Sequence, residues 1–140
     1  MNERLARSGL GPRGRVFAED ARLALPRLEP DGSVDAIFFH FPDPWWKKRH
    51  RKRLVLGPSL LDEVARLLRA EGELFVQTDV EDRAALYETE IGAHAAFAAA
   101  GDTSGSARLS ENPYQGRSHR ERRAIDDAIP IYRLRYLKKA

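Results

Sequence analysis

The stretch Val34-Asp35-Ala36-Ile37-Phe38-Phe39 decides the fold class. It is a short, mainly apolar run, and the turn-forming residues Pro30-Asp31-Gly32-Ser33 come directly before it. A run of this length that follows a turn predicts a mostly buried strand. We therefore expect a strand at residues 34–39.

A helix and a second strand follow this first strand. Pro58 is typical of a first helical position, and Gly72 is typical of a residue just beyond a helix. Apolar residues recur between them at helical spacing, at Leu60, Leu61, Val64, Leu67 and Leu68. Residues 73–78 predict another strand. The order strand, helix, strand predicts a βαβ unit, and hence an α/β fold with a parallel sheet and right-handed crossovers.

The segments on either side are shorter or less regular. Before the central unit, the sequence predicts a short helix at residues 2–8, a strand at 15–18 and a helix from about 19 to Leu25 that Pro26 stops. After it, the sequence predicts a helix at 81–100, a loop at 101–106 and a brief strand at 107–109. A polar stretch through Asp127 and a final strand at 129–137 complete the chain.

Length and composition favour one domain that spans residues 1–140. The chain is 42% apolar and 32% charged, an ordinary mixture for a globular protein. It has no cysteine, which excludes disulfides and thiolate metal sites, and we expect no metal. No apolar run approaches the roughly 20 residues of a membrane span, and the N-terminus has no apolar signal core. We therefore expect a cytoplasmic protein without a membrane partner, of unknown oligomeric state.

The positive charge of the chain is concentrated in one segment. The formal net charge is only +3, yet residues 47–53 hold six Lys or Arg side chains. Without them the chain would be net negative, so the pattern favours a binding site for a polyanion over a generally basic surface. The other interpretation is a solvated charge run. We disfavour it because the segment is internal and follows an apolar strand and two tryptophans.

Acidic residues follow the predicted strands at Asp20, Asp43 and Asp79. Ligands of parallel α/β sheets bind beyond the carboxyl ends of the strands, so these three acids should lie on the same rim. A single acid at such a position is more often a helix cap than a ligand contact. Three acids beside a basic segment favour a binding site.

The segment between residues 41 and 53 carries the chemistry. Pro42 and Pro44 restrict the backbone on both sides of Asp43, which orients its carboxylate. Trp45 and Trp46 offer faces for stacking next to cations that bind phosphate, a combination that suits an unstacked RNA base. One of the two tryptophans is expected to belong to the core.

The run Phe41-Pro42-Asp43-Pro44-Trp45, followed by Lys47-Lys48-Arg49-His50 and Lys52-Arg53, closely resembles the signature of the bacterial tRNA (guanine-N7)-methyltransferase family. That family methylates the guanine at position 46 in the tRNA variable loop. The resemblance extends to Glu19-Asp20-Ala21, Gln77-Thr78-Asp79, Ser118–Glu121 and Pro130-Ile131-Tyr132. It implies a class I, Rossmann-like and doubly wound fold, S-adenosylmethionine as cofactor and tRNA as partner.

The resemblance also implies roles for particular residues. Asp43 is expected to be catalytic and to lie where cofactor and guanine meet, orienting the guanine and offsetting its developing positive charge. Asp20 is expected to bind the cofactor together with Asp43. Expected tRNA contacts are Lys47, Asp79, Ser118, His119, Arg120 and Glu121, and expected phosphate contacts are Lys48, Arg49, Arg51, Lys52 and Arg53. His119-Arg120 departs from the family's usual Lys-Phe, so the contacts of this loop are the least defined.

Two elements of the family pattern are absent from the sequence, namely the glycine-rich cofactor loop after strand 1 and the acid after strand 2. The family's sheet has the order 3-2-1-4-5-7-6, so we expect an N-terminally incomplete fold in which residues 15–18 lack their neighbours. We also expect the isolated chain to be inactive. The alternative is a non-catalytic RNA-binding remnant that uses residues 47–53 and the arginines at 117, 120, 122 and 123.

Overall fold

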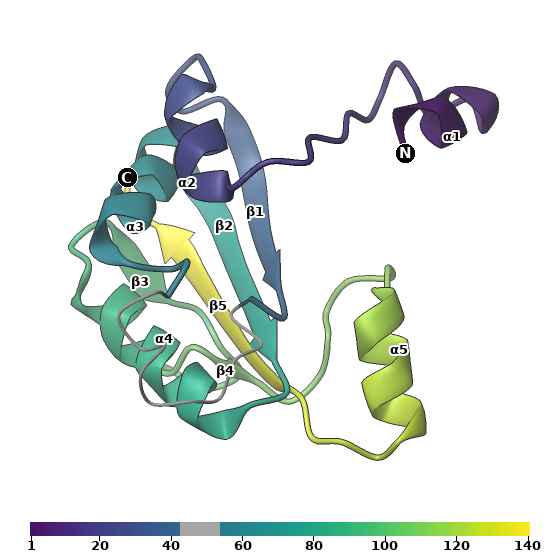
Figure 1. Cartoon of the computed structure of the whole chain (residues 1–140). Helices are drawn as coiled ribbons and strands as arrows, with labels where there is room; N and C mark the ends of the chain where they lie inside the picture. Colours follow the sequence, from purple (N-terminus) through teal and green to yellow (C-terminus); the bar gives the residue numbers. More distant parts are fainter. Residues whose placement is uncertain (43–53) are drawn as a thin grey trace.

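The computed structural model describes residues 1–42 and 54–140, which contain a five-stranded sheet with the helices between residues 21 and 93 on one of its faces (Figure 1). The strands are β1 (Val34–His40), β2 (Leu68–Thr78), β3 (Phe97–Ala99), β4 (Arg108–Leu109) and β5 (Tyr132–Lys138). The helices are α1 (Asn2–Arg7), α2 (Ala21–Ala24), the 3-10 turn η1 (Leu25–Arg27), α3 (Pro58–Leu67), α4 (Glu81–Ala93) and α5 (His119–Asp126).

The predicted βαβ unit is present in the structure. β1 and β2 are parallel neighbours, and α3 packs on one face of the sheet, where Leu60, Leu61 and Val64 are buried against Leu74 and Val76. Burying each such side chain contributes about 1.5–3 kcal/mol to stability. The helix ends at Leu67, earlier than predicted, because β2 already begins at Leu68.

The sheet order is β1-β2-β5-β3, and β4 also pairs with β5. This order agrees with the 4-5-7-6 part of the expected methyltransferase sheet. The prediction of a parallel sheet holds for β1 and β2 only, since β5 is antiparallel to β2, β3 and β4. The reason is that Tyr132, at the start of β5, lies opposite Thr78, at the end of β2. A chain that enters at this edge must run back along β2.

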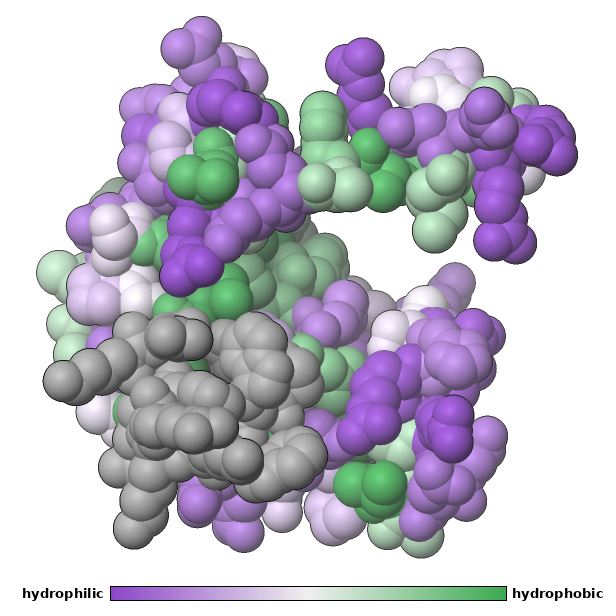
Figure 2. Space-filling model, in the orientation of Figure 1, coloured by the Kyte–Doolittle hydropathy of each residue, from purple (hydrophilic) through white to green (hydrophobic). Residues whose placement is uncertain are grey.

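The strand predicted at residues 15–18 is wrong. These residues form no strand, and Val16 and Phe17 are exposed. They belong to the N-terminal segment, which stands away from the rest of the molecule (Figure 2). The backbone of Val16 is bonded instead to Asn2, whose side chain accepts from the Val16 N–H (2.7 Å) and donates to its carbonyl (2.9 Å). β1 is also less buried than predicted, because it lies at the end of the sheet order, and Phe38 is 42% exposed.

Two further predictions need correction. The helix predicted at 81–100 ends at Ala93, because Phe97–Ala99 pairs with β5 and buries Phe97. The polar stretch through Asp127, for which no helix was predicted, contains α5, whose buried residues are Glu121 and Ala124. The buried face of α5 is therefore short and partly polar, so its sequence shows no apolar periodicity from which a helix could be predicted.

The loop predicted at residues 101–106 is confirmed, and Gly101 makes it possible. The Gly101 N–H donates to the Ser106 carbonyl (2.6 Å). A Cβ atom at Gly101 would lie only 2.3 Å from the Arg108 carbonyl oxygen. Only glycine fits where two stretches of backbone approach this closely.

Within residues 1–42 and 54–140, no helix combines the length and the apolar character needed to cross a bilayer.

Candidate active site

The carboxyl ends of β1 and β2 form a common edge, because His40 lies opposite Gln77 in the parallel pair. A cavity of about 630 Å³ opens at this edge. The residues that line it are His40, Phe41, Pro42, Thr78, Asp79, Val80 and Arg120. Its volume falls within the roughly 300–1,000 Å³ typical of small-molecule sites, and its place at the strand ends is where α/β folds bind ligands.

The backbone at the end of β1 is held in an unusual conformation. Phe41 has a φ angle of 51°, in the left-handed region that costs a non-glycine residue on the order of 1–3 kcal/mol. Its N–H donates to the Gln77 carbonyl (2.7 Å), and the Tyr87 hydroxyl donates to the Pro42 carbonyl (3.3 Å). These bonds fix the backbone of the cavity wall up to Pro42.

Helix α5 begins beside the same cavity. Ser118 is its N-cap, and the Ser118 hydroxyl accepts from the Glu121 N–H (3.1 Å). Arg120 forms an ion pair with Asp79, and its guanidinium carbon lies 6.0 Å from the centre of the Phe41 ring, within the range of a cation–π contact. His119, the first residue of the helix, is exposed. Of the predicted residues of this loop, the structure thus brings Arg120 together with Asp79 at the cavity.

Glu121 points into the protein, and its side chain has no exposed area. Its carboxylate accepts from Asn112 Nδ2 (2.9 and 3.1 Å), from Gln77 Nε2 (3.2 Å) and from the Arg133 guanidinium (3.2 Å). The Arg133 side chain is only 10% exposed. Buried charges persist when they are paired and hydrogen-bonded, and this network joins α5 to β2 and β5.

The pKa values of Glu121 and of His40, which is bonded to Gln77, are both lowered. Burial acts to raise the pKa of Glu121, but hydrogen bonds from Asn112, Gln77 and Arg133 outweigh it and hold that pKa below its usual value. The partial burial of the His40 ring lowers the pKa of His40, and the negative charge of Glu121 acts weakly in the opposite direction. At neutral pH, the site therefore combines an ionised Glu121 with a neutral His40.

Asp20 lies apart from this cavity, at the start of α2 (Figure 1). Its carboxylate accepts from the Arg22 side chain (2.6–3.2 Å) and from the Arg22 N–H (2.9 Å). These bonds, with the side-chain bond the largest cause, lower the pKa of Asp20 to about 2. Because no strand precedes Asp20, the prediction that it shares a rim with Asp79 is wrong. It is an N-cap with 38% of its side chain exposed.

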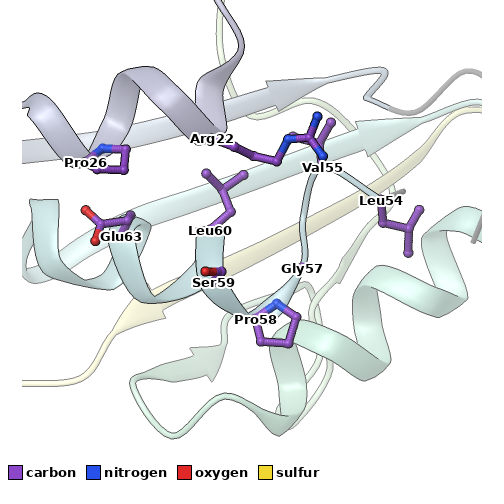
Figure 3. Close-up of a pocket in the computed structure, with 9 residues that line it drawn as sticks. All are labelled: Arg22, Pro26, Leu54, Val55, Gly57, Pro58, Ser59, Leu60 and Glu63. Atoms are coloured by element: carbon purple, nitrogen blue, oxygen red, sulfur yellow. The ribbon is translucent and has the colours of Figure 1, made fainter. Parts of the chain in front are cut away.

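A second hollow, of about 300 Å³, lies beside Asp20's partner Arg22, at the start of α3 (Figure 3). In this view, Arg22 extends from α2 towards Val55, and Leu60 lies between the two helices. The full lining is Arg22, Pro26, Leu54, Val55, Gly57, Pro58, Ser59, Leu60 and Glu63. Among the described residues, none lines both this hollow and the cavity at the strand ends.

Part of the predicted site falls on residues 43–53, outside the described residues. These are the predicted catalytic Asp43, the predicted tRNA contact Lys47 and the predicted phosphate contacts Lys48, Arg49, Arg51, Lys52 and Arg53. In the described part of the chain, no group of three or more His, Asp or Glu side chains is arranged to hold a metal ion.

Four residues of the network, His40, Gln77, Asn112 and Arg133, were not predicted as site residues. A usable signal existed for Gln77, which is a polar residue in an otherwise apolar strand directly before Thr78-Asp79. Asn112 and Arg133 gave no such signal, because their contacts with Glu121 depend on how α5 folds back onto the sheet.

The comparison with known families identifies the class of protein. A family model described as "Putative methyltransferase" matches residues 15–134. The chain belongs to this methyltransferase family, a family of transferases, and the resemblance inferred from residues 41–53 is confirmed.

Individual relatives are named more narrowly, each as a tRNA (guanine-N(7)-)-methyltransferase. The protein from Paramagnetospirillum magneticum is 48% identical over 88 residues, which cover 63% of this chain and 37% of the relative. The one from Rhodopirellula baltica is 40% identical over 114 residues (81% and 41%). The one from Myxococcus xanthus is 34% identical over 126 residues (90% and 60%). The matched part of the chain thus spans between 37% and 60% of the length of these relatives.

Proposed function

We propose that this chain forms the part of an S-adenosylmethionine-dependent tRNA (guanine-N7)-methyltransferase that receives the guanine and the surrounding tRNA. The observation that carries the proposal is the cavity at the ends of β1 and β2, because Phe41 and Pro42, which begin the family motif, form part of its wall. The names of the relatives supply the reaction. The proposed target is the guanine at position 46 of the variable loop, and the proposed location is the cytoplasm.

Asp43 is the proposed catalytic residue. S-adenosylmethionine supplies the methyl group, so a bond forms from guanine N7 to the methyl carbon while the carbon–sulfur bond breaks and sulfur keeps the electron pair. N7 carries a lone pair and no proton, so Asp43 is not required as a base. Its carboxylate accepts from the guanine N1–H and amino group, which orients the ring and offsets the positive charge that the base acquires.

The described residues fit a guanine site beside a cofactor. Thr78 and Asp79 offer oxygen atoms at the cavity, Phe41 offers an aromatic ring, and Arg120 offers a cation for phosphate. The Asp20 carboxylate, ionised at neutral pH and partly exposed, is a suitable acceptor for the adenine amino group of the cofactor. Asp20 and Asp43 are thus the proposed cofactor contacts.

Of the residues expected to contact tRNA, the proposed direct contacts are Lys47 in the basic segment, Asp79 at the strand end, and His119 and Arg120 at the start of α5. The other cations of the basic segment, Lys48, Arg49, Arg51, Lys52 and Arg53, are proposed to bind phosphates. Within α5, Ser118 and Glu121 act mainly by holding the helix beside the cavity, since both are engaged within the protein. The exposed His119 and Arg120 are the members of this group that can reach RNA.

A chimera tests this proposal. The matching segment of the Myxococcus xanthus relative, which covers 60% of that protein, is replaced by this chain, and methyl transfer to tRNA is measured with identification of N7-methylguanine. We expect the chimera to be active and the 140-residue chain alone to be inactive. Asp43→Asn keeps the size of the side chain but loses its charge, and it should reduce activity more than tenfold, a loss of about 1.4 kcal/mol or more in transition-state stabilisation.

Two results would contradict the proposal. Retention of more than about a tenth of the activity by both Asp43→Asn and Asp43→Ala would remove Asp43 from the catalytic role, by the same conversion of rate into free energy. A folded chimera that binds tRNA without methylating it would instead favour the non-catalytic RNA-binding alternative.

A further inference from the structure

Gln77 occupies the point where the end of β1, the end of β2 and the start of α5 meet. It is completely buried. Its backbone carbonyl accepts from the N–H of Phe41 (2.7 Å). Its side-chain Nε2 lies 2.8 Å from His40 Nδ1 and 3.2 Å from Glu121 Oε2. One residue thus contacts both the strand that leads into the family motif and the helix beside the cavity.

The chemistry of Glu121 determines the orientation of the Gln77 amide. An ionised carboxylate only accepts hydrogen bonds, so the amide atom near Glu121 must be the NH₂ group. The same NH₂ group faces His40, so His40 Nδ1 must be the acceptor and the ring proton must sit on Nε2. Turning the amide over would place its oxygen against Glu121. Gln77 therefore selects one tautomer of His40.

The Oε1 atom of the Gln77 amide indicates that this side chain does more than fill space. Among the described residues, Gln77 Oε1 has no hydrogen-bond partner although it is buried. A buried acceptor without a partner is unfavourable, and an apolar side chain of similar length would fill the space without that cost. What only the amide provides is the pair of hydrogen bonds to His40 and Glu121.

We propose that Gln77 is a positioning residue for methyl transfer. By bonding His40 and Glu121 at once, it fixes the end of β1, from which the chain continues into the motif at Phe41 and Pro42, relative to the first turn of α5. Arg120 and Asp79 are thereby held at the same cavity. This inference rests on the proposed function, and Gln77 is assigned no contact with guanine or cofactor.

The kinetic test uses Gln77→Met in the Myxococcus xanthus chimera, because methionine keeps the length of the side chain and removes both hydrogen bonds. The matched control is Val76→Ala, at the adjacent position of β2, which faces the apolar core. We expect Gln77→Met to lower kcat about tenfold or more, with KM for tRNA changed by less than about threefold. Val76→Ala should lower the melting temperature at least as much while keeping kcat. A loss of kcat equal in the two variants would overturn the positioning role.

A second measurement does not depend on activity. Nitrogen-15 NMR of the His40 ring in the 140-residue chain reports its tautomer. We expect the Nε2–H form alone in the unaltered chain and a mixture of the Nε2–H and Nδ1–H forms in Gln77→Met, because a neutral imidazole without this partner populates both. An unchanged tautomer in this variant would overturn the inference even if the chimera is active. If the chimera is inactive but the tautomer responds as expected, the proposed function fails and the contact of Gln77 with His40 stands.

Discussion

Two carboxylates at the starts of helices, Asp20 at α2 and Glu121 at α5, differ in their exposure and in how far along the chain their hydrogen-bond partners lie. Both accept hydrogen bonds from arginine, and both have a lowered pKa. Asp20 is bonded to Arg22, two residues along the chain, and its side chain is 38% exposed. Glu121 is bonded to residues of β2, of β5 and of the loop before α5, and it has no exposed area.

The difference shows how the surroundings of a charge decide what it can do. An exposed ion pair between near neighbours contributes little to stability, so Asp20 can exchange Arg22 for a ligand at small cost. A buried carboxylate with several donors cannot leave its place without exposing those donors to an unfavourable environment. Glu121 therefore organises the architecture around the cavity, whereas Asp20 is open to the cofactor contact proposed for it.

The largest loss of stability is expected for Glu121→Ala, which tests whether the burial of this carboxylate distinguishes it from Asp20. The substitution leaves Arg133 buried without its carboxylate, and removing one partner of a buried pair costs about 3–5 kcal/mol. Urea unfolding of the 140-residue chain measures it. Glu88→Ala is the control, since Glu88 pairs with Arg108 at a site where both side chains are about one-third exposed. Equal losses in the two variants would mean that the burial of Glu121 is unimportant for stability.

The pH dependence of stability should separate the two acids from His40. The folded pKa of His40 is below its usual 6.5, so the neutral ring contributes stability above pH 6.5 that is lost as the pH falls towards the folded value. Glu121 contributes stability above its usual 4.5 that is lost at lower pH. The pKa of Asp20 is lowered from 3.8 to about 2, so the contribution of Asp20 to stability is lost only as the pH falls through that interval.

Unfolding measured from pH 7 to pH 3 tests this order. We expect the loss to begin below pH 6.5, and His40→Phe, which keeps an aromatic ring, should flatten the curve in the interval just below pH 6.5. A curve for His40→Phe that still falls with the original slope in that interval would show that another group titrates there.

A smaller loss of stability is expected from removing the N-cap of α5. Ser118→Ala removes the hydroxyl that accepts from the Glu121 N–H, and it should destabilise the chain by about 1 kcal/mol, within the usual 0.5–2 kcal/mol for an N-cap. Ser118→Asn should restore most of this loss, because asparagine is also a good cap. Urea unfolding of both variants distinguishes capping from a general sensitivity of the position.

The smallest effect is expected for Asp20→Asn. Asparagine keeps the cap of α2 and its hydrogen bond from the Arg22 N–H, and it loses only an exposed charge. The urea midpoint should therefore stay unchanged, while the chimera should bind S-adenosylmethionine more weakly in a calorimetric titration. A large loss of stability would show that Asp20, like Glu121, is part of the architecture.

The sequence predicted the centre of the fold because that part follows local rules. The turn at residue 32, the apolar run at 34–39 and the helical spacing after Pro58 each specify an element without distant partners, and all three are present. The predicted strand at 15–18 failed because a strand needs a neighbour to bond with. α5 escaped prediction because Glu121, one of its few buried residues, is polar.

The sequence predicted those residues of the candidate site that can be recognised from their local sequence. Asp79 came from its place after a strand, and Ser118 and Glu121 came from the family resemblance. Their partners Asn112 and Arg133 lie 9 and 12 residues from Glu121 in sequence, and they meet it only after α5 has folded against the sheet. Contacts of this kind follow from tertiary structure and leave no periodic pattern in the sequence.

Gly101 affects how a saturation mutagenesis map of this protein would be interpreted. Any larger side chain there would collide with the Arg108 carbonyl, so the position should tolerate no replacement, in the same way as a residue that touches substrate. Under the proposed function, a screen of chimera variants that scores only methylated tRNA would rank Gly101 together with Asp43. Scoring the cellular abundance of each variant as well would separate them, because changes at Gly101 would deplete the protein and Asp43→Asn would leave its amount unaltered.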